Sequence, residues 1–347
     1  FEEIHRNNII VYAIVQHAVL TGNIDYITKY GLEVMIAVSR FWSQRVSFSQ
    51  PNRNMSYWGL PARDEYENNV DNNWYTNYSC IQCLKMTLRF LEMVAQQYPD
   101  EYAHIRRITN LDQVKESARW RDIIEHMYLP EDKERGIFIQ NDGYMDKVLE
   151  STDNIPAEER PINQHWSWDR ILRSCYIKQS DVLLGLYLYY FYFDTETVRR
   201  NFEFYEPMTV HESSFSHIHS ILLHASAKWK KLTSFLHATR LDLDDYNNEA
   251  DQGLHITSMP GSWLAIVRGF AGMQVLKETL CFSPVIPQKW DSYSFKVNYL
   301  KNTLHIRVGK EIEISLTAGS KVDIQVYGHP YTLERGTELK INMPMCQ

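Results

Sequence analysis

The sequence predicts a mainly α-helical domain that is followed by a small C-terminal antiparallel β-domain. In the first and larger part, apolar residues recur with the spacing of buried helix faces. Beyond Cys281, apolar and polar residues alternate strictly, as they do in half-buried strands. Pro284 and Pro287 mark the change of period. The chain has 347 residues, of which 44% are hydrophobic, so it has enough apolar material for a large core.

The N-terminal part predicts two helices and then an irregular connection. A first apolar surface is formed by Ile9, Ile10, Tyr12, Ala13, Ile14, Ala18 and Val19. Residues 30–42 are apolar nearly all round, which predicts a buried helix. The breakers Pro51, Gly59 and Pro61 predict a loop or a hairpin over residues 43–61.

The middle of the chain predicts further helices that are separated by polar loops. A long helix is predicted over residues 74–97 and a more charged helix over residues 112–127. Residues 141–164 are polar and contain proline, so they are predicted to be mostly loop. Helices resume near Ser167, and others are predicted over 179–193, 196–204, 214–237 and 263–276, with a polar loop at 241–248.

The C-terminal part contains alternating segments that predict strands over residues 295–299, 304–308, 312–316 and 322–326. Turn signals separate them, among them Asn302, Gly309 and Gly319. Consecutive short strands with turns between them predict an antiparallel β meander.

Composition excludes several classes of partner. The net charge is −7 and no basic block stands out, which argues against nucleic acid and anionic membranes as partners. No apolar run reaches the length of a membrane span. The five cysteines are odd in number and scattered, which favours reduced thiols and a cytoplasmic location. The chain starts at Phe1 without an initiator Met and runs straight into a helical pattern, so we expect a fragment that begins inside a larger domain.

The stretch from Asp64 to Tyr78 is the most informative for function. It mixes carboxylates, amides and aromatic rings in consecutive positions. Carboxylates and amides hydrogen-bond to hydroxyl groups, and aromatic rings stack on the apolar faces of sugars, so the stretch predicts one wall of a carbohydrate site. The alternative is an Asn-rich helix start in which Asn72 or Asn73 caps the helix that begins near Trp74.

Glu65 is the candidate catalytic residue in this stretch. It lies among Asp64, Glu67 and Asp71, and neighbouring aromatic residues could desolvate it. Both effects favour a protonated carboxyl group, which a general acid requires. The alternative is an ordinary solvated loop glutamate.

Three other segments carry chemistry-bearing residues. Lys178-Gln179 precedes an apolar helix and offers donors for sugar hydroxyls or an anion, although Ser180 or Asp181 could simply cap that helix. Residues 211–220 concentrate hydroxyls and imidazoles at a predicted helix start, where free N–H groups bind anions such as phosphate. Residues 253–258 resemble another such turn.

Metal and redox sites are not predicted. His217 and His219 are two positions apart and would point to different faces of a helix. Residues 242–247 carry Tyr and Asn where a calcium loop needs a ligand and Gly. Cys80 and Cys83 have no second pair, so we expect them to pack in a helix.

In their order along the chain, these motifs resemble glycoside hydrolase family 65, the group that contains maltose, trehalose and kojibiose phosphorylases. The resemblance covers nearly the whole chain and is carried by residues 1–7, 40–42, 64–66, 75–77, 178–179, 211–214 and 253–259. It implies an incomplete (α/α)6 barrel over residues 1–278 that lacks its first helices, and a jelly-roll-like β-domain over residues 279–347. The family's N-terminal β-sandwich would also be absent.

The resemblance implies inverting phosphorolysis. Glu65 matches the family's general acid, and Lys178 and Gln179 match residues that bind the donor glucose. Phosphate is a co-substrate and already an anion, so it needs no base, and no cofactor is expected. The phosphate cradle is assigned to Ser213, Ser214, His255 and His219.

The disaccharide expected from the resemblance is maltose, because residues 67–69, 73–75 and 241–248 look like those of maltose phosphorylases of lactic-acid bacteria. Trehalose, trehalose 6-phosphate and kojibiose remain alternatives, as do a family hydrolase and a truncated, non-catalytic carbohydrate-binding remnant. Ala62-Arg63 stands where the family commonly has Gly-Pro, and residues 216–231 also depart from its pattern. Relatives are often dimers, so a homodimer is expected for the complete protein.

Overall fold

The computed structural model describes residues 3–49, 54–212, 232–245, 248–249, 251, 253–276, 278–287 and 289–344. The chain divides into two compact units. The first comprises Phe1–Ala18, Asn23–Leu188 and Glu203–Val210. The second comprises Val19–Gly22, Tyr189–Phe202 and His211–Gln347. Among the helices of the described ranges, none is both long and apolar enough to cross a membrane.

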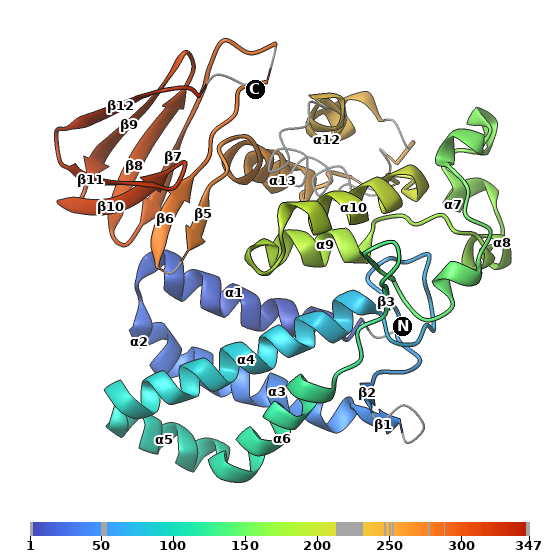
Figure 1. Ribbon diagram of the computed structural model, residues 1–347, viewed down its shortest axis with the longest axis horizontal. Coiled ribbons are helices and arrows are strands. Elements are labelled where there is room, and N and C mark those ends of the chain that lie inside the picture. Colours follow the sequence, from blue (N-terminus) through green and yellow to red (C-terminus); the bar gives the residue numbers. More distant parts are fainter. Residues whose placement is uncertain are drawn as a thin grey trace. The chain divides into compact units, whose positions relative to one another are not determined.

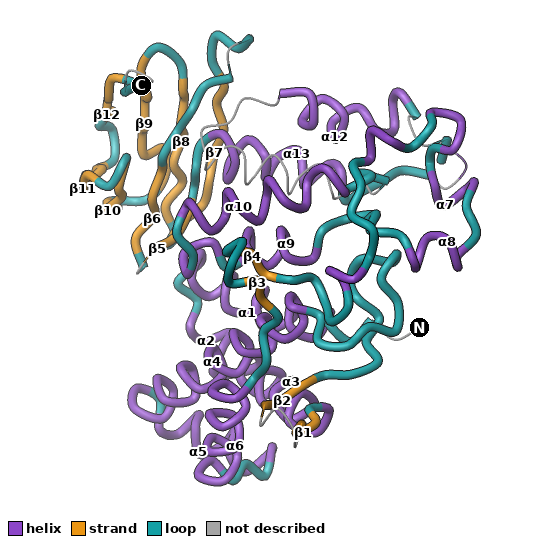
Figure 2. Tube along the Cα trace, turned by 45° about the vertical axis from the view of Figure 1, so that its right-hand side comes forward, coloured by secondary structure: helices purple, strands orange, loops and turns teal. Residues whose placement is uncertain are grey.

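Helices make up most of the first unit. They are α1 (Arg6–Thr21), α2 (Ile24–Tyr26), α3 (Leu32–Arg45), α4 (Trp74–Gln97), α5 (Pro99–Thr109), α6 (Gln113–His126), α7 (Ile162–His165), α8 (Trp168–Arg173) and α9 (Asp181–Leu188), with a π-helical turn η1 (Ile27–Gly31) between α2 and α3. Helix α4 contacts α3, α5 and α6, which lie beside it in Figure 2. The helices predicted over residues 30–42, 74–97 and 112–127 are confirmed.

The start of α4 is set by Asn73. Its side-chain oxygen accepts the backbone N–H of Thr76 at 3.0 Å, which satisfies one of the free N–H groups of the first turn. Helix α9 packs closely on this start, because a Cβ atom at Gly185 would lie 2.6 Å from Cζ3 of Trp74. The first residues of α4 and α9 are thereby held together.

Short strands and turns connect these helices. The hairpin of β1 (Ser47–Ser49) and β2 (Asn54–Ser56) agrees with the loop or hairpin predicted there, whereas the pair β3 (Glu131–Asp132) and β4 (Ile137–Phe138) was not predicted. Most of residues 141–164 form loop, as predicted. The short 3-10 turns are η2 (Tyr144–Asp146), η3 (Thr152–Asn154), η4 (Ala157–Glu159), η5 (Tyr190–Tyr192) and η6 (Glu206–Met208).

The second unit confirms one predicted helix and corrects the ends of two others. Helix α10 (Thr195–Tyr205), which runs from the second unit into the first, confirms the helix predicted over 196–204. Helix α12 (Leu232–Asp244) continues beyond residue 237 into the polar loop predicted at 241–248. The helix predicted over 263–276 is instead α13 (Ser258–Leu264) and the π-helix η8 (Ala265–Phe270). It ends there because Gly272 has φ +58° and a Cβ atom at this position would lie 2.9 Å from the Ser283 carbonyl.

The C-terminal β-domain consists of two four-stranded sheets, in the orders β11-β10-β6-β5 and β12-β9-β8-β7. Figure 1 shows the two sheets facing one another. Their strands are β5 (Gln274–Leu276), β6 (Thr279–Phe282), β7 (Tyr293–Tyr299), β8 (Asn302–Val308), β9 (Glu311–Ala318), β10 (Lys321–Val326), β11 (His329–Glu334) and β12 (Glu338–Asn342). The prediction of a mainly α chain with a C-terminal β-domain of jelly-roll type is confirmed.

One feature of the predicted meander is wrong. Strands β7, β8 and β9 pair in succession and antiparallel, as predicted, but β10 leaves this sheet. It pairs antiparallel with β11 and parallel with β6. The reason is burial: Ile306 and Ile314 on one sheet and Val322 and Ile324 on the other are all nearly inaccessible, and two facing sheets cover both apolar surfaces. Each such side chain stabilises the fold by about 1.5–3 kcal/mol.

Candidate active site

Glu65 lies in a tight loop between β2 and α4. The loop is closed by backbone hydrogen bonds between Leu60 and Val70, at 2.7 and 2.9 Å, and its tip by a bond from the N–H of Ala62 to the Glu67 carbonyl at 3.0 Å. The side chain of Glu65 is 46% exposed, so its carboxylate is accessible while the backbone that carries it is fixed.

The structure brings three of the predicted site residues together. The Gln179 side-chain amide donates to Oε2 of Glu65 at 3.2 Å, across 114 positions of sequence, and also to the Arg63 carbonyl at 3.3 Å. Nζ of Lys178 lies 3.8 Å from Oε1 of Glu65. Both oxygens of the Glu65 carboxylate therefore face donors from the segment that precedes α9.

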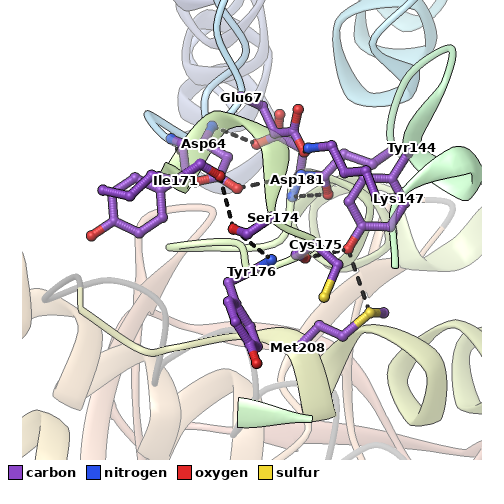
Figure 3. A network of polar contacts seen from close by, with 12 residues as sticks. Asp64, Glu67, Tyr144, Lys147, Ile171, Ser174, Cys175, Tyr176, Asp181 and Met208 are labelled. Carbon is purple, nitrogen blue, oxygen red and sulfur yellow. Dashed lines mark hydrogen bonds and ion pairs between the residues drawn. The ribbon is translucent and has the colours of Figure 1, made fainter. Parts of the chain in front are cut away.

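Two buried carboxyl groups lie beneath this contact, Asp64 and Asp181, and each side chain is fully inaccessible. Asp181 accepts the backbone N–H of Arg63 at 3.2 Å and that of Asp64 at 3.1 Å. Asp64 accepts the backbone N–H of Lys178 at 3.0 Å and that of Tyr66 at 3.2 Å. Figure 3 shows these two carboxyl groups within one polar network.

Side-chain amides complete the hydrogen bonding of this pair. Asn73 donates to Oδ2 of Asp181 at 2.8 Å, and Gln140 donates to Oδ2 of Asp64 at 3.4 Å. The oxygen of the Gln140 amide accepts the backbone N–H of Asp181 at 3.3 Å. Each carboxyl group is thus surrounded by donors, which offsets the cost of removing it from water.

Burial dominates the acidity of both groups. It raises the pKa of Asp181 to about 7, against the opposing effect of the Arg63 charge and of the hydrogen bonds from Asn73 and the backbone. Burial likewise raises the pKa of Asp64 well above its usual value, and the neighbouring charge of Asp181 raises it further. A charged Asp181 therefore opposes ionisation of Asp64, while the donors around both groups favour their charged forms.

A second buried ion pair supports the same loop. The carboxylate of Glu67 is 2.6 Å from Nζ of Lys147, and both side chains are largely shielded from solvent. Lys147 also lies over the ring of Tyr144, whose hydroxyl donates to the Cys175 carbonyl at 2.8 Å. Burial raises the pKa of Glu67 and the Lys147 charge opposes it. These contacts, also drawn in Figure 3, join the Glu65 loop to η2 and to the chain before α9.

The aromatic residues near Glu65 differ from the predicted sugar-stacking wall. Tyr66, Trp74 and Tyr75 are all buried, with Trp74 stacked on Tyr78 at 4.9 Å between ring centres. They therefore belong to the core. The alternative interpretation, in which Asn73 caps the helix, is the correct one for this part of the stretch. Trp168, by contrast, is 56% exposed, and its ring lies nearly perpendicular to the Tyr66 ring.

The predicted phosphate cradle is described only in part. Ser213, Ser214 and His219 lie outside the described residues, as do residues 216–231. His255 is described and belongs to the second unit, in the connection between α12 and α13.

The imidazole of His255 faces carboxylates. Its Nδ1 is 2.6 Å from Oδ1 of Asp242, and its Nε2 is 3.5 Å from Oε2 of Glu249. The hydrogen bond from His255 lowers the pKa of Asp242. These residues and Asp245 line a cavity of about 150 Å³. An anion could bind His255 only after it had left one of these partners.

Sequence reasoning missed the groups that hold the site. The sequence indicates Asp181 only as a helix cap and Asp64 only as a like charge beside Glu65, and it indicates no role for Gln140 or Lys147. A carboxylate directly before Glu65 was the one available signal for Asp64.

Cys80 and Cys83 are buried in α4, as predicted for packing residues. Over the described ranges, no three His, Cys, Asp or Glu side chains are arranged to hold a metal ion.

Comparisons with known proteins agree with this architecture. The model of the glycosyl hydrolase family 65 central catalytic domain matches residues 1–264, and that of the family's C-terminal domain matches residues 273–333. A maltose phosphorylase of Bacillus subtilis (strain 168) is 48% identical over 338 residues, which is 96% of this chain and 44% of that protein. An α,α-trehalose phosphorylase of Thermoanaerobacter brockii is 33% identical, over 96% of this chain and 43% of that protein.

A solved structure is also similar. A putative kojibiose phosphorylase from human microbiome superposes with a TM-score of 0.90 and 31% identity, over 98% of this chain and 50% of that chain. The chain thus spans about half the length of the relatives that it matches. The match of both family models, in order, shows that this chain belongs to glycosyl hydrolase family 65.

Proposed function

We propose that this chain carries the general acid of a phosphorylase that cleaves an α-linked glucose disaccharide, with maltose as its substrate. The observation that supports this most directly is the convergence of Glu65, Lys178 and Gln179, which come from segments 114 positions apart. Relatives named as phosphorylases of maltose, trehalose and kojibiose support the reaction class. The higher identity to the maltose enzyme, 48% against 33% and 30%, favours maltose.

In this mechanism the Glu65 carboxyl group protonates the glycosidic oxygen as the bond from the anomeric carbon to that oxygen breaks. Inorganic phosphate attacks the anomeric carbon from the opposite face. The configuration inverts, and the products are β-glucose 1-phosphate and glucose. Lys178 and Gln179 orient the Glu65 carboxyl group and bind the donor glucose.

A hydrolase on the same fold would need a second carboxylate that activates water, about 6.5–9.5 Å from the acid. The carboxylates nearest to Glu65 in sequence, Asp64 and Glu67, are buried, and so is Asp181. Their oxygens already accept backbone or side-chain donors. None of these three buried carboxylates is placed to activate a water molecule.

Ser213, Ser214, His219 and His255 remain the proposed phosphate-binding residues. For His255 this requires exchange of Asp242 or Glu249 for the anion. Ser213→Ala and Ser214→Ala are each expected to raise the KM for phosphate about tenfold and leave the KM for maltose nearly unchanged, as the loss of one hydrogen bond to a charged ligand predicts.

The direct test is to incubate the full-length protein with maltose, trehalose or kojibiose, each with and without phosphate, and to quantify glucose and sugar phosphate. We expect equal amounts of the two products from maltose, and only when phosphate is present. Release of glucose without phosphate would instead indicate the hydrolase, and preferred turnover of trehalose or kojibiose would overturn the choice of maltose.

A further inference from the structure

We infer that Asp64 and Asp181 form a reciprocal clamp that sets the position of Glu65 against Lys178 and Gln179. Each carboxyl group belongs to one of the two segments and accepts backbone N–H groups of the other. The inference rests on the proposed role of Glu65 as the acid. It assigns to both aspartates a positioning role in the reaction, since neither is exposed to a substrate.

Each of the two segments donates backbone N–H groups to the aspartate of the other segment. From the α9 side, Asp181 accepts the N–H groups of Arg63 and Asp64 at 3.2 and 3.1 Å, the two residues that precede Glu65. From the loop side, Asp64 accepts the N–H of Lys178 at 3.0 Å. It also accepts the N–H of Tyr66 at 3.2 Å, on the other side of Glu65. The backbone is therefore held by carboxyl oxygens both before and after Glu65.

The clamp is anchored on the start of α4. Asn73, the residue that caps α4, donates to Asp181 at 2.8 Å. Gln140 donates to Asp64, accepts the N–H of Asp181, and through its own carbonyl accepts the N–H of Trp74 at 2.9 Å. The close approach of α9 to α4 at Gly185 leaves this anchor little freedom to shift.

A carboxyl group suits this task better than an amide. Both oxygens of Asp181 accept backbone N–H groups, one from Arg63 and one from Asp64. An asparagine would offer one oxygen and turn its NH2 group toward the other N–H, which would leave two donors facing each other in a buried site. The expected result of Asp181→Asn is a displaced loop and a misplaced Glu65, and a shift of about 1 Å costs about 100-fold in rate.

The test separates positioning of the acid from general loss of structure. Maltose needs protonation of its departing glucose, whereas α-glucosyl fluoride has a leaving group that departs with little help from an acid. We expect Asp181→Asn and Asp64→Asn, in the full-length protein with phosphate, to lose about 100-fold in kcat on maltose. Their kcat on α-glucosyl fluoride should stay within about threefold of wild type.

Two further variants make the result decisive. Glu65→Gln must show the same selective loss, and if it does not, the proposed function fails rather than the clamp. Gln140→Leu keeps both carboxyl groups and removes one support, so it should show the same selectivity with a loss of about tenfold, even if the aspartate variants do not fold. Equal losses on both substrates in folded variants, or no loss on maltose, would overturn the clamp.

Discussion

The interior of the region around Glu65 is rich in polar side chains, whereas the interior of the C-terminal β-domain is almost entirely apolar. In residues 278–344, as far as they are described, the buried polar side chain is Asn302, and the interior is otherwise apolar. Beside Glu65, by contrast, Asp64, Asn73, Gln140 and Asp181 are all buried. Burying a carboxyl group is costly unless donors surround it, so such a concentration indicates a place where geometry matters more than stability. Apolar burial therefore stabilises the fold of the β-domain, whereas buried hydrogen-bonded polar groups position the site.

Glu65→Gln should give the largest effect of any single change. A general acid contributes about 100- to 10,000-fold, so kcat on maltose should fall by a factor in that range. Stability should hardly change, because the Glu65 side chain is 46% exposed. Steady-state kinetics and a thermal melt of the same preparation check this. A variant with near wild-type kcat would show that the acid is another residue.

Ile314→Ala tests the opposite region. Ile314 is fully buried and pairs with Ile306 on β8, so its truncation should lower the free energy of unfolding by about 2–5 kcal/mol. The kcat per folded molecule should not change. Glu311→Ala, at an exposed position of the same strand, is the matched control, with an expected change within about 0.5 kcal/mol. A loss of kcat in folded Ile314→Ala would contradict the conclusion that the β-domain core affects stability and not catalysis.

The pH dependence of stability offers a finer test through His5. Burial lowers the pKa of His5 from 6.5 to about 4, so the folded state binds fewer protons than the unfolded state between these values. The contribution of His5 is therefore present above pH 6.5 and is lost as the pH falls toward 4. Replacing His5 with Gln should reduce the stability difference between pH 7.5 and pH 5 by about 1–2 kcal/mol.

Asp181 acts in the opposite sense. Its pKa is raised from 3.8 to about 7, so its contribution is present below pH 3.8 and is lost as the pH rises through 7. Asp181→Asn should therefore remove a decrease of stability between pH 4 and pH 7. Urea unfolding of both variants at several pH values measures how the contributions of His5 and Asp181 to the free energy of unfolding change with pH. If both contributions changed with pH in the same direction, the assignment of the two pKa shifts to burial would be contradicted.

The smallest expected effect is at the surface of the β-domain. Arg307 and Glu313 form an ion pair at 3.2 Å with side chains that are 54% and 24% exposed. Glu313→Ala should change the free energy of unfolding by less than about 1 kcal/mol, and less still at high salt. Chemical unfolding at low and high salt measures this. A change above 2 kcal/mol would mean that surface charge contributes to the β-domain as strongly as its core.

The two regions also differ in how far the sequence predicts them. The bounds of α4 were predicted, because the periodicity of residues 74–97 follows a capping residue, Asn73. Strict alternation predicted the strands from β7 to β10. It did not predict that β10 joins the other sheet, because a period of two residues identifies a strand and not its partner.

At the site, Glu65, Lys178 and Gln179 were predicted from local composition and from the family resemblance. The clamp could not be predicted, since its bonds join residues 117 and 114 positions apart. Asp181 before an apolar helix has the signature of an ordinary cap. Only the folded chain shows that its oxygens accept the backbone of the Glu65 loop instead.

The configuration of the sugar phosphate formed from maltose tests the central claim most directly. Proton NMR of the full-length protein, maltose and phosphate, recorded during the first turnovers, distinguishes the two anomers by their coupling constants. Protonation by Glu65 with attack of phosphate from the opposite face predicts β-glucose 1-phosphate as the initial product. The α anomer as the initial product would contradict the account.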